Sequence, residues 1–223
     1  MHQAFRSSRR LMRSPNFVAT RRFRHETSGV AAVEFALILP VMLLILVGMT
    51  ELSNGIDNWR KVTLLSRTVA DLTSQGDKQN PMSAASMDDI LKSSKLVLLP
   101  FDSTNAQIVV SALGVDIKNL SLKPRVCSSV ASSNAKARQV GVASDLDVPL
   151  GFQVNGTRYI LAEVTMLYTP MLGSALVNFL GGTNGQIKLV VKTPWPTRGG
   201  QPYGQNSYSE VVLPSGVACP APL

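Results

Sequence analysis

The hydrophobic pattern of the chain begins with an apolar run of about twenty residues, Val30 to Met49, which contains a single charged residue, Glu34. At 1.5 Å per residue, a helix of this length is about 30 Å long and matches the hydrocarbon thickness of a bilayer. Pro40 interrupts the run, but a membrane helix tolerates proline because neighbouring helices satisfy the freed carbonyl group. The run therefore predicts a transmembrane helix over residues 30–50.

Apolar residues continue after this run at spacings of three and four. Such spacing places them on one face of a helix. They are Leu52, Ile56, Trp59, Val62, Leu65, Val69 and Leu72. No strong stop signal precedes Gly76, and charged residues occupy the opposite face. We therefore expect an amphipathic helical extension over residues 51–76, whose apolar face packs on the rest of the chain or on a partner helix.

From residue 77 onward the pattern changes to short elements. A second helix is predicted over residues 83–99, capped by Ser83 or Ser86 and stopped by Pro100. Runs rich in β-branched and aromatic residues predict four antiparallel strands, at 106–117, 124–131, 158–168 and 185–195. Residues 76–81 predict a loop, residues 170–182 a short helix or ordered loop, and the Pro- and Gly-rich residues 194–223 an irregular tail. The predicted fold class is α+β, with a small antiparallel-sheet domain over residues 77–193.

The net charge of +8 is concentrated in front of the apolar run. Seven arginines and one acid, Glu26, precede Gly29, which gives +6 (7 − 1); the arginines are Arg6, Arg9, Arg10, Arg13, Arg21, Arg22 and Arg24. We interpret residues 1–29 as a cytoplasmic leader that obeys the positive-inside rule. A mitochondrial transit peptide and a nucleic-acid-binding arm are the alternatives. Because only +2 (8 − 6) remains for the rest of the chain, we expect no nucleic-acid partner.

Both cysteines of the chain, Cys127 and Cys219, follow the predicted span. With the arginines inside the cytoplasm, this part of the chain lies outside it, where an even number of cysteines suggests a disulfide. The bond would close a loop of about ninety residues and contribute roughly 4–5 kcal/mol in the chain-entropy account. Two unrelated thiols are the alternative.

The residue types that carry chemistry do not indicate an enzyme. The only histidines, His2 and His25, lie in the leader, so the external domain has no imidazole base or metal ligand. Asp145 and Asp147 are suited to a hard cation, but two acids in a polar segment are more often a solvated turn. We therefore expect no catalytic residue, no metal and no cofactor.

The sequence GVAAVEF, Gly29–Phe35, resembles the processing site of type IV prepilins. The resemblance implies that a prepilin peptidase cuts between Gly29 and Val30, and that the Glu34–Phe35 pair serves processing and assembly. Together with the arginines before it and the helix after it, the segment from Arg21 to about Leu72 is similar to the TadE/TadF pseudopilins of the tight-adherence (Flp) pilus. A weaker likeness lies at 162–173, AEVTMLYTPMLG, which is similar to a strand followed by Tyr-x-Pro in TadE-like domains.

The resemblance implies a minor, non-enzymatic pseudopilin of the bacterial inner membrane, with a single span, a cytoplasmic N-terminus and a periplasmic domain. Its partners would be the prepilin peptidase, other pilins and pseudopilins, the secretion platform and membrane lipid. An uncleaved single-pass scaffold or adaptor protein is the first alternative. A mitochondrial or eukaryotic type II membrane protein is the second.

The cost of a charge in hydrocarbon indicates a role for Glu34 independently of the resemblance. Cleavage would create an ammonium group at Val30, about one helical turn from Glu34. A carboxylate in hydrocarbon needs a positive partner, and such a terminus on a neighbouring subunit would supply one and fix the register between the helices. In an uncleaved anchor, Glu34 would instead extend to the nearby membrane interface.

Overall fold

The computed structural model describes residues 28–76, 81–116, 122–170, 174, 178, 185–203 and 208–221. The predicted leader lies outside these residues, except for its last two positions. Most of the predicted loop at 76–81 and of the segment at 170–182 also lies outside them. The chain divides into two compact units, Met1–Met49 and Thr50–Leu223.

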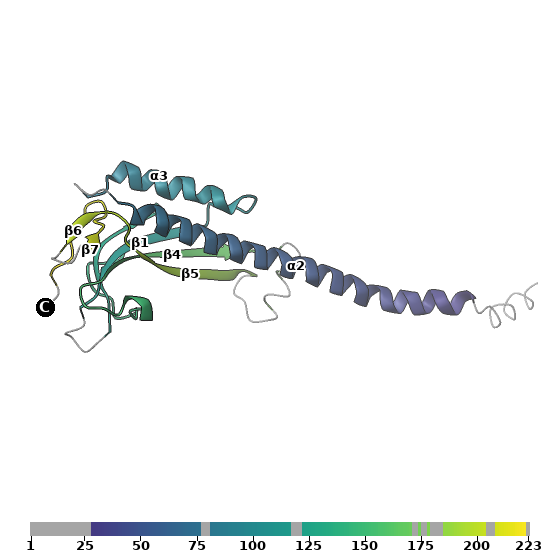
Figure 1. The fold of residues 1–223 in the computed structure, drawn as a ribbon. Coiled ribbons are helices and arrows are strands. Elements are labelled where there is room, and N and C mark those ends of the chain that lie inside the picture. The colour runs from purple at the N-terminus through teal and green to yellow at the C-terminus, as the bar shows by residue number, and fades with distance from the viewer. Residues whose placement is uncertain are drawn as a thin grey trace, which may run out of the picture. The chain divides into compact units, whose positions relative to one another are not determined.

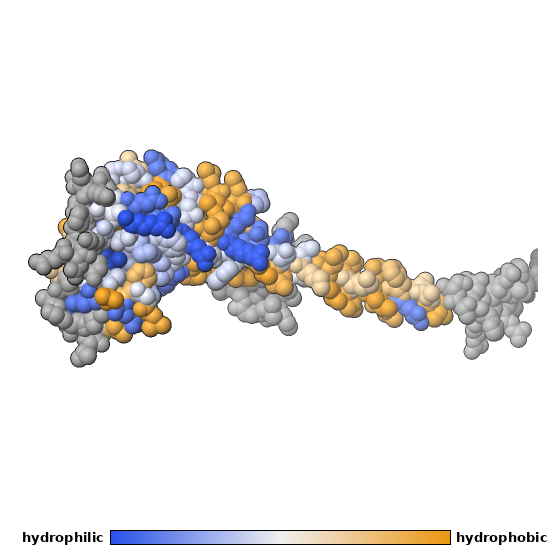
Figure 2. Space-filling view, viewed as in Figure 1, coloured by the Kyte–Doolittle hydropathy of each residue, from blue (hydrophilic) through white to orange (hydrophobic). Residues whose placement is uncertain are grey.

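The predicted long N-terminal helix is confirmed as α2 (Ser28–Ser74), which continues through Pro40 (Figure 1). In the first unit nearly every described side chain of this helix is exposed, and the surface is predominantly apolar (Figure 2). Among the described residues, α2 is the one helix long and apolar enough to cross a membrane. The predicted membrane-span character of the helix is therefore confirmed.

Five strands form an antiparallel sheet in the order β3-β2-β1-β4-β5. They are β1 (Gln107–Gly114), β2 (Arg125–Ala131), β3 (Gly141–Val142), β4 (Arg158–Tyr168) and β5 (Ile187–Pro196). Four of them fall on the predicted runs, so the α+β fold is confirmed. The strand β3 was not predicted because two residues are too few to show an alternating pattern.

The second half of α2 lies on one face of this sheet (Figure 1). Val62, Leu65 and Val69 are fully buried there against Ile108 of β1 and Ile160 of β4, among other residues of the main core. Polar side chains add direct links. Ser66 Oγ donates to the Ala162 carbonyl at 3.1 Å and lies 2.8 Å from Thr193 Oγ1, while Trp195 Nε1 donates to Asp71 Oδ1 at 3.2 Å. The predicted amphipathic extension therefore packs on the sheet through its C-terminal part.

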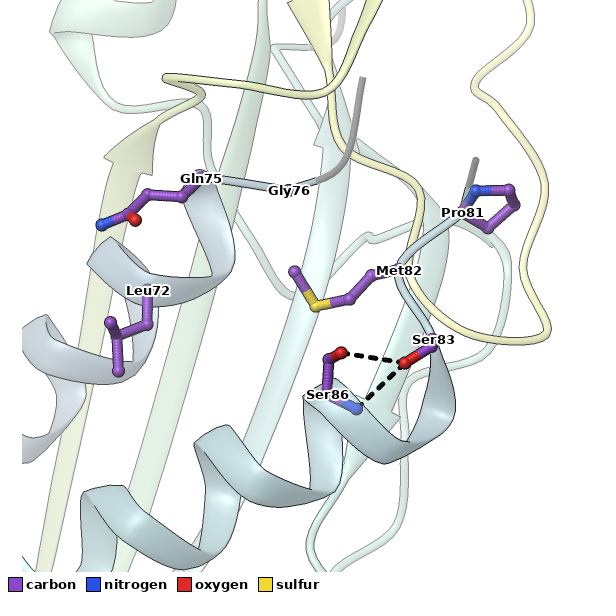
Figure 3. Close-up of a pocket in the computed structure, with 7 residues that line it drawn as sticks. All are labelled: Leu72, Gln75, Gly76, Pro81, Met82, Ser83 and Ser86. Atoms are coloured by element: carbon purple, nitrogen blue, oxygen red, sulfur yellow. Dashed lines mark hydrogen bonds between the residues drawn. The ribbon is translucent and has the colours of Figure 1, made fainter. Parts of the chain in front are cut away.

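The second predicted helix is split into two elements. The α-helix α3 (Ala84–Ser94) is followed by a 3₁₀ turn, η1 (Lys95–Leu98), before Pro100. Ser83 is the N-cap, because its hydroxyl accepts from the Ser86 backbone N–H at 3.0 Å (Figure 3). Met87, Leu91 and Leu98 of these elements are buried in the main core.

A smaller core covers one end of the opposite sheet face. It consists of Leu113, Val115, Val126, Ala143, Leu146, Val148, Tyr159 and Leu161. The 3₁₀ turn η2 (Leu150–Phe152) adds Phe152, whose ring centroid lies 4.7 Å from that of Tyr159. Because successive residues of β4 point to opposite faces, Ile160 joins the main core while Tyr159 and Leu161 join the smaller one.

The predicted irregular tail, residues 194–223, contains three short strand segments, and the prediction is wrong for these. The strand β5 continues to Pro196, and β6 (Gln201–Tyr203) pairs with β7 (Tyr208–Glu210) as an antiparallel hairpin. Val211 and Leu213 then enter the main core. Gly200 has φ of +100°, and a Cβ there would lie 2.1 Å from the Glu210 carbonyl oxygen, so only glycine fits where the two strands meet.

The apolar face predicted on α2 is only partly covered. Val62, Leu65 and Val69 are buried, whereas Leu52, Ile56 and Trp59 are 65%, 46% and 47% exposed. These last three residues, here named the exposed stripe, are not enclosed by the sheet domain. Packing on the rest of the chain is therefore confirmed for Val62, Leu65 and Val69, while a partner helix over the exposed stripe stays a prediction.

This division predicts the effect of truncating each part of the face. Leu65→Ala should lower the free energy of unfolding by about 2–5 kcal/mol because it leaves a cavity in the core. Trp59→Ala, which removes a larger but half-exposed side chain, should cost about 1 kcal/mol or less. Thermal or denaturant unfolding of the two variants measures both changes. A loss for Trp59→Ala equal to that for Leu65→Ala would contradict the placement of Trp59.

Candidate functional site

The residues predicted for processing lie in the first two turns of α2. Gly29 and Val30 are in the first turn, with Glu34 and Phe35 in the next, and all four are exposed. A Cβ at Gly29 would meet no atom within 4 Å, so packing within the chain does not require glycine there. Glu34 lies four residues after Val30, which places both on one side of the helix.

The apolar surface around Glu34 has no cover among the described residues of the first unit. Phe35, Ile38 and Leu44 are 60%, 55% and 72% exposed, as are most large side chains up to Met49. An uncovered apolar surface of this extent is compatible with hydrocarbon or with other helices, but not with water. The first unit therefore offers a helix that is long and apolar enough to cross a membrane, with one acid near its start.

The exposed stripe belongs to the second unit and borders a shallow hollow. Trp59 lines this hollow together with Leu64, Thr63 and two arginines, Arg60 and Arg67. Indole beside guanidinium groups is a combination enriched at protein–protein interfaces. The second unit therefore presents a partly apolar helix surface with basic residues beside it.

A cleft between α2 and the end of β4 contains several polar groups, of which Asp102 and Tyr168 have hydrogen-bond partners. Its lining includes Asn54, Asn58, Phe101, Asp102, Asn105 and Tyr168. Asp102 accepts from the Thr104 backbone N–H and hydroxyl, both at 2.8 Å, and these bonds lower its pKa. The Tyr168 hydroxyl lies 3.4 Å from Glu51, and burial followed by this carboxylate raises the pKa of Tyr168. Asn58 is buried, and its Oδ1 has no hydrogen-bond partner among the described residues.

Another hollow lies between the end of α2 and the start of α3 (Figure 3). It is lined by Leu72, Gln75, Gly76, Pro81, Met82, Ser83 and Ser86. None of these seven residues carries a carboxylate, an imidazole or a thiol. The two serines bond to each other across the start of α3, with their Oγ atoms 2.9 Å apart. The described lining of this hollow therefore provides no group for acid–base chemistry.

A cluster of charged side chains lies on the sheet face away from α2. Arg138 donates to both oxygens of Asp145, at 3.0 and 2.8 Å, and to Glu163 of β4 through Nε and Nη2. Lys192 of β5 lies 3.3 Å from Glu163. Burial alone would raise the pKa of Glu163, but the bonds and charges of Arg138 and Lys192 outweigh it and lower the pKa. The bonds from Arg138 likewise lower the pKa of Asp145.

The two acids considered for a cation both form ion pairs. Asp147 lies 2.5 Å from Lys123, and Asp145 pairs with Arg138. Both carboxylates are mainly exposed. The pairing with Glu163 was not predicted because Arg138 and Glu163 are 25 residues apart in the sequence. The sequence offered one signal of this ion pair, which is the acid Glu163 at an alternating position of the predicted strand 158–168.

The two cysteines lie at disulfide distance, with Cα atoms 4.9 Å apart. Glu210 is buried beside them and accepts from the Cys219 backbone N–H. Burial raises the pKa of Glu210. Arg158 Nε lies 3.8 Å from Glu210, and Arg158 Nη2 donates to the Pro220 carbonyl at 3.0 Å. The ligand atoms of Cys127, Glu210 and Cys219 lie within 4.8 Å of one another, but sulfurs joined to each other are not thiolate ligands.

Comparison with known proteins identifies the N-terminal part of the chain. The family model for TadE-like protein matches residues 29–71, which include Gly29, Val30, Glu34, Phe35 and the exposed stripe. The predicted resemblance to TadE-like proteins is confirmed for this segment, and it indicates involvement in a tight-adherence pilus system and association with the membrane and with components of that system. No curated protein and no solved structure matches the chain significantly.

The geometry of the cysteines leads to a prediction for protein from an oxidising compartment. A non-reducing protease digest should contain one cross-linked pair of peptides carrying Cys127 and Cys219. Replacing both cysteines by alanine should lower the free energy of unfolding by about 2–5 kcal/mol, because the unfolded chain loses its covalent loop. Two thiols that are freely alkylated in the native protein would contradict the bond.

The charge cluster predicts a loss of stability in acid. Because the pKa of Glu163 is lowered in the folded state, its stabilising contribution is complete above its unfolded pKa of about 4.3 and is lost as the pH falls through the folded value. Glu163→Gln should therefore cost about 1–3 kcal/mol at pH 7 and should flatten the fall in stability below about pH 4.5.

Asp147→Asn is the matched control, since the Asp147 carboxylate is 84% exposed. It should change the free energy of unfolding by about 0.5 kcal/mol or less. Unfolding by urea at a series of pH values measures both variants. Parallel pH profiles for the wild-type chain and Glu163→Gln would contradict the role of the cluster.

Proposed function

We propose that this chain is a minor pseudopilin that acts in the assembly of a tight-adherence (Flp) pilus. The observation that carries the proposal is the TadE-like match over residues 29–71, in which Gly29, Glu34 and Phe35 stand at the exposed start of an apolar helix. The protein works by processing and helix packing, and not as an enzyme.

The proposed organisation follows the sequence. Residues 1–29 are a basic cytoplasmic leader, 30–50 the transmembrane helix and 51–76 its amphipathic extension. Residues 77–193 form the periplasmic α+β domain, and residues 194–223 the C-terminal segment. The arginines before Gly29 hold the leader on the cytoplasmic side of the bacterial inner membrane. The two cysteines then lie in the oxidising periplasm.

In the proposed mechanism, a prepilin peptidase hydrolyses the Gly29–Val30 peptide bond. The leader leaves with the Gly29 carboxylate, and Val30 keeps the new ammonium group. Glu34 then pairs with the ammonium group of a neighbouring pilin or pseudopilin in the membrane. A charge pair in a medium of low dielectric constant is costly to misplace, so it fixes the axial register of the helices.

Trp59, the far end of the exposed stripe, supports contact with a partner protein rather than with lipid. Trp59 lies nine residues after Thr50, or about 14 Å farther along α2. The polar headgroup layer on each side of the hydrocarbon is only about 5–8 Å thick. An upright helix therefore carries Trp59 beyond the headgroups, where water or protein surrounds it. We propose that a partner helix on the secretion platform or in the pilus covers the stripe.

An uncleaved single-pass scaffold protein is the second candidate. It is favoured by the position of Gly29 and Val30 inside the first turn of α2, since a peptidase acts on extended chain. Terminal turns of helices fray readily, so the first turn can open for cleavage. The two candidates differ in the mass of the membrane-bound protein.

Processing is tested in membranes of cells that carry a prepilin peptidase. The mature protein should begin at Val30, and Gly29→Leu should retain the leader because the bulky side chain does not fit where the peptidase holds the chain. Gly48→Leu is the matched control, because it adds the same side chain to the same helix, also without a contact within 4 Å. It should be processed normally. Intact-mass measurement reads out all three proteins.

Glu34→Ala separates processing from assembly. The variant should be cut at Gly29 and should insert at least as well as the wild-type chain, because it removes a charge from the span. Pilus formation, however, should fall to the level of a strain without the protein. A full-length mass for the wild-type chain in the presence of active peptidase would contradict the pseudopilin and favour the uncleaved scaffold.

A further inference from the structure

The strand β5 is an edge of the five-stranded sheet. It has ten residues, Ile187–Pro196, and pairs with β4 along its whole length, from Ile187 opposite Tyr168 to Pro196 opposite Tyr159. The other edge, β3, has two residues. A long edge strand presents a row of backbone N–H and C=O groups to which another strand can pair. The outer edge of β5 is therefore the larger backbone surface that this sheet offers (Figure 1).

Two prolines define which residues of β5 face outward. Proline has no N–H, so within a sheet it fits positions whose N–H would point away from the neighbouring strand. Pro194 and Pro196 occupy such positions on β5. In an antiparallel pair these positions alternate, so the N–H and C=O groups of Lys188, Val190 and Lys192 also point outward. The prolines interrupt pairing at the C-terminal end of the edge and leave residues 188–192 able to pair.

The side chains of these outward-facing positions are accessible and carry a defined pattern. Lys188 and Lys192 are exposed on either side of Val190, which is 41% exposed. All three lie on the sheet face away from α2, where Leu167 of the adjacent β4 is also 41% exposed. Among the described residues, no backbone hydrogen bond joins another loop or turn to residues 188–192. The edge thus displays a positive–apolar–positive triplet at alternate positions.

The charge pattern opposes pairing between two copies of this chain. In an antiparallel pair centred on Val190, Lys188 of each copy would stand opposite Lys192 of the other, and like charges directly opposite are destabilising. An acid opposite a lysine is favourable, and the sheet already contains this arrangement on its inner side. There Glu163 of β4 is the cross-strand partner of Lys192, with a separation of 3.3 Å.

We propose that the outer edge of β5 binds an extended, acidic segment of another protein as an added antiparallel strand. The segment carries acids at two positions that are four residues apart and an apolar residue midway between them. Its backbone pairs with Lys188, Val190 and Lys192, its acids face the two lysines, and its apolar residue contacts Val190. This binding mode is β-strand addition, in which the backbone supplies affinity and the side chains supply selectivity.

The first test needs no partner. In the ¹⁵N-labelled full chain in detergent micelles, amide hydrogen exchange should alternate along β5. The amides of Leu189, Val191 and Thr193, which face β4, should exchange slowly, and those of Lys188, Val190 and Lys192 should exchange fast. Slow exchange at all six positions in the isolated chain would mean that its own residues already cover the edge, and would overturn the proposal.

The second test adds a capped peptide, Thr-Glu-Thr-Val-Thr-Glu-Thr, as the probe. It should shift the amide resonances of Lys188, Val190 and Lys192, and a peptide with lysines in place of the glutamates should bind about tenfold more weakly. Equal binding of the two peptides, shifts confined to α2, or no shift at about 5 mM peptide would each overturn the proposal.

Variants of β5 separate edge pairing from simple charge attraction. Val190→Pro removes one outward N–H, as Pro194 does farther along, and should weaken binding of the acidic peptide about tenfold or more while the melting temperature stays near that of the wild-type chain. Lys188→Glu should reduce binding of the acidic peptide and strengthen that of the lysine peptide. Arg67→Glu, an equal charge change on the exposed side of α2, should alter neither. Undiminished binding to folded Val190→Pro would overturn strand addition.

Discussion

The burial of the second half of α2 against the sheet holds the sheet domain together. Val62, Leu65 and Val69 are fully enclosed there, and burial of each such side chain contributes about 1.5–3 kcal/mol. Ser66 stands in the same contact surface and bonds to β4 and β5, so the helix is fixed along its length as well as held by apolar area. The helix α3 and the C-terminal Val211 and Leu213 complete the same core. Without α2, the main face of the sheet would lie open to water.

The opposite face of the sheet is covered in a different way. At one end the loop around Leu146 and η2 builds a small apolar core. Beside this core Arg138 binds Glu163 of β4 and Asp145 instead. A charge cluster leaves the neighbouring edge strand polar and accessible, whereas a second helix would have hidden it. Most of the apolar packing thus lies on the sheet face that α2 covers, and the opposite face is left available for contacts.

Periodicity in the sequence was sufficient to predict most of the fold but not the tertiary contacts. Spacings of three and four identified α2, and β-branched runs identified β1, β2, β4 and β5. The same spacing could not tell that Val62 is buried and Trp59 is exposed, since both are apolar positions on one helix face. The structure within the tail was not predicted, because its many Pro and Gly residues indicated a loop where the chain forms a short hairpin and buries Val211–Leu213. The processing residues were recognised from their motif, since nothing in their packing distinguishes them.

The link between Cys127 and Cys219 has a mechanical consequence. The two residues are 92 positions apart, and the segment between them includes β4, β5 and the C-terminal hairpin. While the bond is intact, a pulling force that enters through α2 and leaves the chain beyond Cys219 can straighten only the chain outside this loop. Roughly 300 Å of contour length stays locked, at about 3.3 Å per extended residue. Under tension the domain would therefore extend by less than its full contour length and then stop, as a tether of fixed maximum length does.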